Sequence, residues 1–452
     1  MRSRLAHGMD RPSAGTCDKS DPAPCGGGAA GDAPPEARTI AAVAAESARQ
    51  NLPATIERLR TLCAVDSGTD APWGRERVTE YLRVWAEAAG CEVERVPTDQ
   101  GTALVARLRV GAVAGPVDAA AGARTPGPRP PVIALIGHHD TVFRTGEALR
   151  CGFAVRDGKV FGPGAADMKG GLVLALEAMA SLARRQNLPA FTVELHSVPD
   201  EETRTGGAFA TLDRLAGARA ALVLECAREN GDLVVARKSQ AHLHMHAEGR
   251  SAHSGTEPER GRSALLALAR EALRLDALTA ARPGLSVTVG TLVAGSSFNS
   301  VAGRGEAEID VRARFAADLD WAIAQIGACG EHDGVEIDLT TISRWPALEE
   351  ADGACRLFAL ARSVGHEIGL DLGACRTGGA SDGCWTSHAG IPTLDGLGPV
   401  GGLDHSPHEY IEADSLPERV GLLAGLIAAI AMEPEGDRGP SAARAAAKSS
   451  VK

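Results

Sequence analysis

Aromatic residues are scarce in this chain of 452 residues, at 3% of the composition, while hydrophobic residues as a whole reach 44%. Alanine, leucine and valine must therefore fill most of the core, and the length suggests two domains. Basic residues are also in the minority: 47 Lys and Arg face 58 Asp and Glu, giving a formal net charge of −11. This balance argues against a nucleic acid or an anionic membrane surface as the main partner.

Signals for disulfides and for export are missing as well. The ten cysteines include no CxxC pair, and several, such as Cys63, Cys226 and Cys329, lie inside apolar runs. This distribution is typical of reduced core thiols rather than of a disulfide framework. Residues 1–40 hold no apolar segment like that of a secretory signal, and no apolar run approaches the roughly 20 residues of a membrane span. We therefore expect a cytoplasmic protein.

Composition and periodicity divide the chain into four parts. Their boundaries are 1–40, then 41–237 together with 347–432, then 238–346, and finally 433–452. We predict that the first and last parts are disordered, because they have little to bury. The second part alternates helices with apolar strands, as an α/β sheet does, and carries an Ala-, Gly- and Pro-rich insertion at 111–131. The third has the order β-α-β-β-α-β, which resembles a ferredoxin-like inserted domain.

Three consecutive carboxylates, Asp200-Glu201-Glu202, follow the strand predicted at 191–198. Such carboxylates repel one another unless a cation lies among them. In extended backbone alternate side chains point to opposite faces, so Glu202 can bind a metal while Glu201 faces water or substrate. An isolated acidic turn is more often simply solvated, so the interpretation depends on the rest of the chain.

Other strand ends and loops of the α/β part supply matching polar residues. The candidate ligands are His138, Asp167, Glu202, Glu225 and His405. Two imidazoles and three carboxylates form a pair of zinc sites if one carboxylate bridges, since each zinc then keeps an open position for water. Asp140 shares a face of the extended chain with His138 and can accept its ring N–H, which favours His138 over His139 as the ligand.

Seven motifs carry a family resemblance. They are GHHDTVF (137–143), GPGAADMKGG (162–171), PDEE (199–202), LECAR (224–228), GRSAHSG (249–255), RTGGASDG (376–383) and GLGPVGGLDHSPHEY (396–410). In this order they resemble the co-catalytic zinc aminoacylase and carboxypeptidase family, which includes glutamate carboxypeptidase, acetylornithine deacetylase and succinyl-diaminopimelate desuccinylase. The resemblance implies a zinc-exopeptidase-like, three-layer α/β catalytic domain with an inserted ferredoxin-like lid that also forms a homodimer.

The resemblance also implies two Zn²⁺ ions per chain, for which Co²⁺ or Mn²⁺ can substitute, with Asp167 as the bridge. The other ligands are then His138 and Glu225 for one ion, and Glu202 and His405 for the other. Glu201 falls on the position of the general base, and Asp140 on that of the carboxylate that supports a ligand. A cis peptide bond after Asp167 is implied too.

Further residues resemble the part of the family site that holds the substrate. His253 matches a lid histidine that stabilises the tetrahedral oxyanion, in dimeric members from the neighbouring subunit. Asn299 and Arg312 look like lid residues that grip a substrate carboxylate, for which the arginine fork is suited. Arg376, beside a Gly-rich turn, is a further candidate.

Several other residues are interpreted as bystanders. His139 and His388 carry no assigned role, and His408 is only a reserve ligand because it lies near His405. Nothing around Lys238 supports a pyridoxal site. The glycines before Lys169 fit neither common phosphate-loop pattern. Cys226 and Ala302 stand where many members of the family have Pro, which leaves the subfamily open.

The leading hypothesis is hydrolysis of an amide between an acyl or peptidyl group and a free amino acid, with C-terminal glutamate first among the candidates. The substrate is then a small peptide or an N-acyl amino acid. The first alternative is N-deacylation, as in acetylornithine deacetylase or succinyl-diaminopimelate desuccinylase. The second is a metal-dependent binding protein without hydrolysis, against which the intact Glu201 argues.

Overall fold

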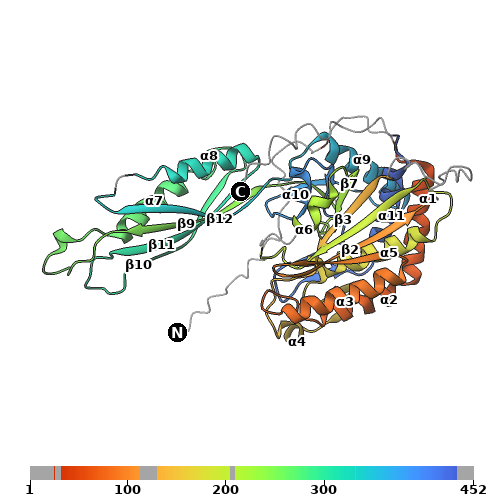
Figure 1. Cartoon of the computed structure of the whole chain (residues 1–452), viewed down its shortest axis with the longest axis horizontal. Coiled ribbons are helices and arrows are strands. Elements are labelled where there is room, and N and C mark those ends of the chain that lie inside the picture. The colour runs from red at the N-terminus through yellow and green to blue at the C-terminus, as the bar shows by residue number, and fades with distance from the viewer. Residues whose placement is uncertain (1–24, 26–31, 112–129, 204–208, 331, 435–452) are drawn as a thin grey trace, which may run out of the picture.

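The computed structural model describes residues 25, 32–111, 130–203, 209–330 and 332–434. Within this part the chain forms a broad α/β unit and an elongated unit that projects from one side of it (Figure 1). Most of the N-terminal segment predicted to be disordered lies outside the described residues. So do nearly all of the insertion at 111–131 and of the tail after 433.

A six-stranded mixed sheet organises the larger unit, in the order β1-β2-β6-β3-β7-β14. The strands are β1 Glu92–Thr98, β2 Gly101–Val110, β3 Val132–His138, β6 Phe191–Val198, β7 Ala220–Val223 and β14 Thr393–Leu394. Strands β6, β3, β7 and β14 run parallel, and β2 runs against both of its neighbours. The carboxyl ends of β6, β3 and β7 therefore meet at one edge, where α/β sheets place their sites.

Helices cover both faces of this sheet, which gives the three layers expected of the fold. On β3, Ile133 and Leu135 face the larger helical layer, and Ala134 and Ile136 face the smaller one. The larger layer contains α1 Pro35–Gln50, α2 Leu52–Cys63, α3 Pro72–Ala88, α5 Gly170–Ala183, α9 Asp352–Glu367 and α11 Ser415–Met432. The smaller contains α6 Phe209–Leu212 and α10 Gly383–His388.

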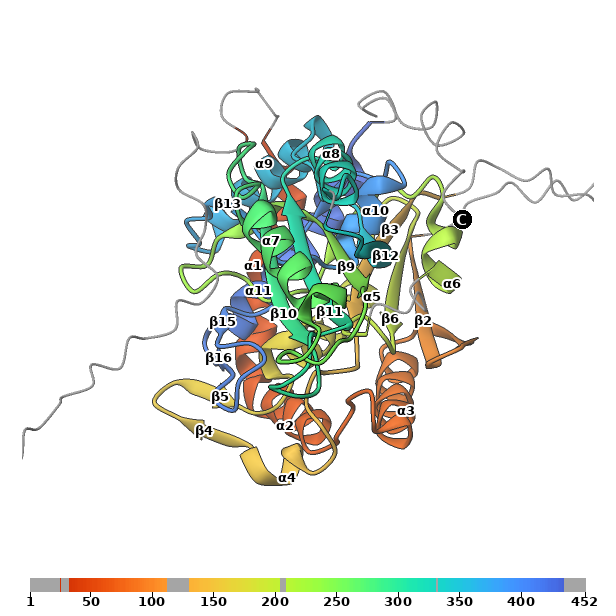
Figure 2. The same cartoon turned by 90° about the vertical axis from the view of Figure 1, so that its left-hand side faces the viewer.

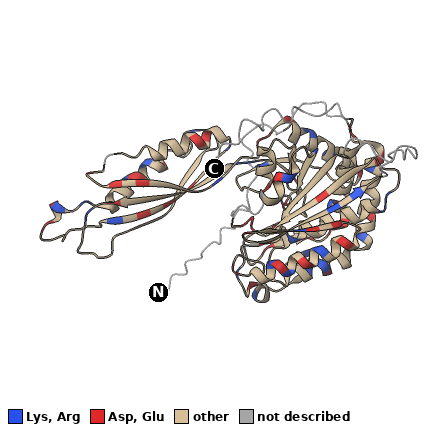
Figure 3. Cartoon of the chain, viewed as in Figure 1, with Lys and Arg blue, Asp and Glu red and all other residues tan. Residues whose placement is uncertain are grey.

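Short elements complete the larger unit. They are α4 Glu147–Cys151, β4 Ala154–Arg156, β5 Lys159–Phe161, β8 Leu233–Arg237, β13 Ala374–Thr377, β15 Gly401–Gly402 and β16 Tyr410–Glu412. Strands β15, β16, β5 and β4 form a small sheet, and β13 pairs with β8. Acidic and basic side chains alternate along the outer helices α2 and α3, where pairs such as Glu80–Arg83 form (Figure 3).

Helix α1 corrects the boundary predicted at residue 40. It begins at Pro35, and Ala37 and Ala41 pack on α11. Glycines of α11 make room for this contact: a Cβ at Gly421 would lie 2.7 Å from Cβ of Ala45, and one at Gly425 2.7 Å from Cβ of Ala41. The alanine-rich composition led to the prediction of disorder. In the structure these small side chains allow α1 and α11 to approach closely.

Helix α11 also corrects the prediction that no apolar segment approaches the length of a membrane span. By length and composition Ser415–Met432 is long and apolar enough to cross a membrane. However, 89% of this segment is buried inside the protein, against α1, α5 and α9. Its apolar character is that of a central core helix.

The projecting unit is ferredoxin-like, as predicted. Its elements are β9 Ser239–Glu248, α7 Ala264–Asp276, β10 Ser286–Ala294, β11 Arg304–Ala313, α8 Ala316–Gly327 and β12 Glu336–Trp345. The sheet is antiparallel in the order β10-β11-β9-β12, and α7 and α8 cover one face of it (Figure 2). We call this unit, residues 239–345, the lid.

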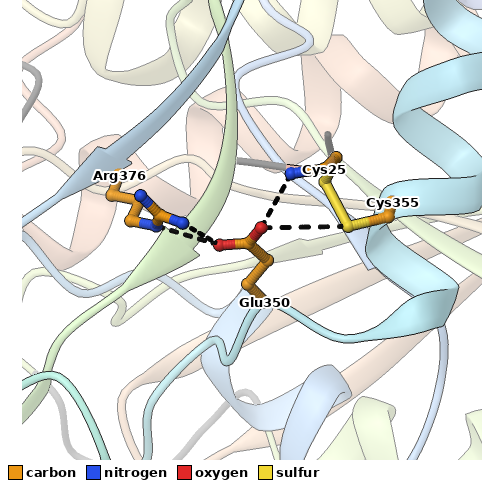
Figure 4. Close-up of a disulfide and its surroundings, with 4 residues drawn as sticks. All are labelled: Cys25, Glu350, Cys355 and Arg376. Atoms are coloured by element: carbon orange, nitrogen blue, oxygen red, sulfur yellow. Dashed lines mark hydrogen bonds and ion pairs between the residues drawn. A yellow bond between two sulfur atoms is a disulfide. The ribbon is translucent and has the colours of Figure 1, made fainter. Parts of the chain in front are cut away.

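A disulfide contradicts the prediction that the cysteines are reduced core thiols. Cys25 is bonded to Cys355 on α9, across 330 sequence positions (Figure 4). Seven others among the described residues carry free thiols, and five of these are buried, whereas Cys151 and Cys329 are half-buried. Cys25 was missed because it lies in the segment predicted to be disordered, and a pair so distant in sequence leaves no local pattern.

Candidate metal centre and active site

Three neighbouring parallel strands deliver the first ligands to one edge of the sheet. His138 ends β3, Glu201 and Glu202 follow β6 in the turn after Val198, and Glu225 lies two residues after β7. The strands β6, β3 and β7 are adjacent, so these side chains meet although they come from distant parts of the sequence.

Two loops supply the remaining ligands. Asp167 lies in the tight turn Ala165–Lys169 that precedes α5, and the Asp167–Met168 peptide bond is cis, as the family resemblance implied. His405 lies in the loop between β15 and β16, with a left-handed backbone at φ 61°. Its side chain is 56% exposed, so this half of the cluster faces solvent.

The carboxylate of Asp167 lies between the two histidines. Its Oδ1 is 3.0 Å from Nε2 of His138, and its Oδ2 is 3.0 Å from Nε2 of His405. Glu225 Oε1 lies 3.5 Å from the same nitrogen of His138, and Glu202 Oε2 lies 3.5 Å from that of His405. The five predicted ligands thus form two groups of three donors that share Asp167.

The residues fit a metal ion. Nε2 of His138 and Oε1 of Glu202 are buried, yet neither makes a hydrogen bond to any described residue. Donor atoms of His138, Asp167 and Glu202 all lie within 4.8 Å of one another. Buried polar atoms that converge while their hydrogen-bonding capacity is not filled are suited to a common cation, which removes the cost of leaving them unsatisfied.

The electrostatics of the cluster point the same way. Burial raises the pKa of Glu202 to about 7, and the nearby Asp167 adds to this shift. Burial, followed by Asp167, also raises the pKa of Glu225. Contacts with Asp167 and Glu202 raise the pKa of His405 to about 11. Repulsion among these crowded carboxylates thus favours a positive charge between them, which a bound cation would supply.

Asp140 supports both the ring of His138 and the acidic turn. The closest acceptor to Nδ1 of His138 is the backbone carbonyl oxygen of Asp140, at 3.1 Å, while its carboxylate Oδ1 lies at 3.4 Å. The carboxylate oxygens accept the backbone N–H groups of Glu201, at 3.2 Å, and of Glu202, at 3.0 Å. Asp140 therefore ties a ligand on β3 to the turn after β6.

Glu201 has the environment that a general base requires. Its side chain is buried beside the cluster, and burial raises its pKa well above the usual range. The positive charge of His138 opposes this shift, and the neighbouring carboxylate of Asp382 adds to it. A carboxylate whose pKa is raised holds a proton more readily than an exposed one, as a group that takes up and passes on a proton must.

Two carboxylates of the site region were missed at the sequence level. Asp382 is buried, neither of its oxygens bonds to a described residue, and burial raises its pKa to about 8. Glu409 is buried against the loop of Asp167. Both lie in motifs that carry the family resemblance, but neither directly follows a predicted strand and the resemblance assigned neither of them a role. His139 is a core histidine, bonded to Ser197 Oγ.

The predicted substrate residues fall into two groups far from each other. His253 and Asn299 lie together on exposed turns, where Ser254 N–H donates to the Asn299 carbonyl oxygen. Strand β9 starts beside the catalytic unit and runs outward for ten residues, so this lid tip lies roughly 30 Å from the lid's base. Within one chain the structure does not bring His253 to the metal ligands.

Arg312 and Arg376 form the second group, at the base of the lid. Nε of Arg312 donates to Asp310, and Nη1 donates to the carbonyl oxygen of Gly378 in the Gly-rich turn, at 2.9 Å. Arg376 donates through Nε and Nη2 to Glu350, whose other oxygen accepts the Cys25 N–H (Figure 4). Both guanidinium groups thus have carboxylate partners within the chain.

The fold and the cluster define a metallohydrolase that acts on amide bonds, and comparisons with known proteins identify its family. The family model described as Peptidase family M20/M25/M40 matches residues 134–429, and the chain belongs to this family. It is 25% identical to carboxypeptidase G2 of Pseudomonas sp. (strain RS-16) over 390 residues, 84% of this chain and 90% of that protein.

Two further similarities extend this result. Succinyl-diaminopimelate desuccinylase of Stenotrophomonas maltophilia (strain K279a) is 28% identical over 317 residues, 66% of this chain and 83% of that protein. The crystal structure of aminopeptidase PepT from Bacillus cereus ATCC 10987 has the same fold, with a TM-score of 0.69 at 22% identity, covering 84% of this chain and 99% of that one. The expected family and fold are therefore confirmed.

Proposed function

We propose that the protein is a dizinc carboxypeptidase that hydrolyses the amide bond between an acyl or peptidyl group and a C-terminal amino acid, with glutamate as the leading candidate. The observation that carries the proposal is the position of Asp167, whose two oxygens each lie 3.0 Å from a different histidine. The similarity to a protein named carboxypeptidase G2 supports this choice of substrate class.

Each residue has a separate part in this chemistry. His138, Glu225 and Asp167 would hold one zinc ion, and the second ion would be held by Glu202, His405 and the same Asp167. When bound, the ions lower the pKa of water and polarise a carbonyl group. Glu201 takes a proton from the attacking water and delivers it to the leaving nitrogen.

His253 completes the site from the partner subunit of a homodimer. Its Nδ1 accepts the N–H of Gly255, so the proton of the neutral ring lies on Nε2 and is available to an oxyanion. The distance of the lid tip from its own metal centre supports action across a dimer. Large apolar side chains exposed on the lid, including Leu273 and Phe298, support an interface there.

Arg312 is the better of the two arginines for binding the substrate carboxylate. Among the described residues its Nη1 bonds to a backbone carbonyl oxygen of the Gly-rich turn, and such a contact is exchanged for a carboxylate with little cost. Arg376 would have to leave Glu350. Asn299 would act beside His253 at the lid tip, where the two lie together.

N-deacylation is the second candidate function, and the similarity to a desuccinylase favours it. A panel of substrates separates the two: N-acyl glutamate, dipeptides with varied C-terminal residues, and N-succinyl and N-acetyl diamino acids, each with purified zinc-loaded protein. We expect release of a C-terminal amino acid. Turnover confined to the N-succinyl or N-acetyl diamino acids would replace the proposal, and no turnover at all would leave a binding protein.

The location in the cytoplasm is also proposed, with neither a nucleic acid nor a membrane as partner. The free thiols among the described residues support it, because seven unpaired cysteines are unusual for an exported protein. The Cys25–Cys355 disulfide argues in the opposite direction. Whether Cys25 and Cys355 are bonded or reduced in cells therefore tests the proposed location.

A further inference from the structure

Glu409 is a buried carboxylate that binds the loop of the bridging aspartate. Its Oε1 accepts the backbone N–H groups of Ala166, at 2.7 Å, and of Asp167, at 2.9 Å. Its Oε2 accepts the N–H of Gly164, at 3.0 Å. Only 2% of Glu409 is exposed. A carboxylate is costly to bury, and three N–H donors from one turn are the compensation that makes this burial tolerable.

The same residue belongs to the loop that carries His405. This loop is folded upon itself: Ser406 Oγ donates to the Leu403 carbonyl oxygen, and Glu409 N–H donates to the Ser406 carbonyl oxygen. His405 and Leu403 both have left-handed backbone, so the loop has one tightly defined shape. The Glu409 side chain therefore joins two loops that lie more than 240 positions apart and that each carry a metal ligand.

The opposite end of the aspartate turn is held independently. Lys169, which closes this turn, is buried and donates from Nζ to the carbonyl oxygens of Leu62, at 3.1 Å, and Val65, at 2.9 Å. Lys169 fixes the turn to the body of the protein. Glu409 fixes it to the His405 loop, and its partner groups include the N–H of Asp167 itself.

We propose that Glu409 is a positioning residue for the metal bridge: it orients Asp167 so that one oxygen faces His138 and the other faces His405. The effect should fall mainly on the ion held by Glu202 and His405, because Glu409 links Asp167 to the loop of that ion. The other ion would be held by His138 and Glu225, which lie at strand ends that Glu409 does not contact in the described structure. This inference rests on the proposed dinuclear function.

Zinc titration of the metal-free full-length protein against a chromophoric chelator tests the proposal. Glu409→Gln keeps the size of the side chain but replaces one acceptor oxygen with an NH₂ group, which faces an N–H. We expect the second zinc ion to bind about 10- to 100-fold more weakly, the range found when residues behind metal ligands are changed. The affinity for the first zinc ion should change less. The Co²⁺-loaded variant should also show an altered visible absorption spectrum.

Glu412→Gln is the matched control, three residues along the chain, because Glu412 is a half-exposed carboxylate paired with Lys159. It should bind both ions like the original protein. Metal-free Glu409→Gln should still fold and should unfold only a few degrees below it, because the weakened hydrogen bonds of one side chain are a small part of the stability of a protein of this size. Glu409→Asp keeps the charge but has a shorter side chain. Its affinity for the second zinc ion should lie between those of Glu409→Gln and Glu412→Gln, and it replaces Glu409→Gln in the titration if that variant does not fold.

Unchanged affinity for both ions in Glu409→Gln and Glu409→Asp would overturn this inference alone. Weakening that appears only together with a large loss of stability in the metal-free protein would make Glu409 a purely structural residue and overturn it too. If the original protein bound no zinc, the proposed function would fall as well, so the two failures are distinguishable.

Discussion

Oδ2 of Asp167 lies 3.0 Å from Nε2 of His405, although 238 positions separate the two residues in the sequence. The other oxygen of the same carboxylate lies equally close to Nε2 of His138. A carboxylate placed between two imidazoles in this way can serve two cations at once. Removing one imidazole should then cost one ion and leave the other.

His405→Ala should therefore reduce the zinc content from about two ions per chain to about one, measured by elemental analysis after dialysis. Activity should fall at least about 100-fold, because the second ion contributes to polarising the carbonyl group. His408→Ala, which changes the reserve ligand of the same loop, should keep both ions. Two retained ions in His405→Ala, or clearly fewer than one in the original protein, would contradict the dinuclear centre.

Glu201→Gln should bind both metal ions normally and lose about 10²- to 10⁴-fold in kcat, the usual contribution of a positioned general base. The physical reason is that the amide has the size of the carboxylate but cannot accept the water proton. Glu202→Gln is the comparison: it should lose metal as well as activity. Turnover retained in Glu201→Gln would remove this residue as the base.

Arg312→Lys should raise KM about tenfold for substrates with a free C-terminal carboxylate and leave kcat within about twofold, since a lysine cannot form the two parallel hydrogen bonds of the arginine fork. The corresponding C-terminal amides should show no such difference. Arg304→Lys, on the same strand but paired with the surface carboxylate of Glu248, is the control. Equal effects on acids and amides would mean that Arg312 only anchors the lid through Gly378.

Reduction of the Cys25–Cys355 bond should lower the free energy of unfolding by about 2–4 kcal/mol, a typical value for a disulfide that closes a long loop. Thermal unfolding with and without a reductant measures this change. Cys355→Ser should show the lower midpoint in both conditions, whereas Cys329→Ser should respond like the original protein. Finding both thiols free in protein trapped directly from cells would support the cytoplasmic location, and an intact bond would contradict it.

The lid should lose stability at acidic pH through Glu271. Burial alone would raise the pKa of this carboxylate, but hydrogen bonds from Arg274 and His332 hold it below its ordinary value. A lowered pKa means that the contribution to stability is complete above about pH 4.5 and is lost as the pH falls through the lowered value.

Comparison with Glu271→Gln tests this dependence. The variant should be less stable than the original protein by roughly 2 kcal/mol at pH 7, because hydrogen bonds to a charged group are lost. The difference between the two should shrink as the pH falls below about 4.5. Glu259→Gln, on an exposed turn, should show no difference at any pH. A difference that stays constant with pH would exclude titration of Glu271 as the cause.

Much of the fold could be predicted because its strands are rich in apolar and β-branched residues. Residues 132–137 and 191–198 indicated buried strands, and both are strands of the main sheet. The first helix was missed for the opposite reason. Its alanines bury little surface on their own, and their role depends on the two glycines of α11 that admit them. An apolar run can be recognised from neighbouring residues alone. The close contact between α1 and α11 depends on residues more than 300 positions apart, so no local pattern predicts it.

The ligand set shows the same division. Polar residues at strand ends and motif order together selected His138, Asp167 and His405, which lie side by side in the structure. Roles that depend on hydrogen bonds across the chain were not visible. Nothing in the sequence around Arg376 indicated that it pairs with Glu350. Nor did the sequence indicate that Glu409 accepts three backbone N–H groups.

The sequence by itself therefore determined the family, the alternating α/β pattern and the choice of candidate ligands, because these depend on residue type and local order. Only the tertiary structure decided which carboxylate oxygen faces which histidine. It also decided that the carboxylate of Asp140 accepts the backbone N–H groups of the acidic turn. The tertiary structure likewise placed His253 at the far tip of the lid. These relations are set by how separate strands and loops pack in space, which no local pattern of residues encodes.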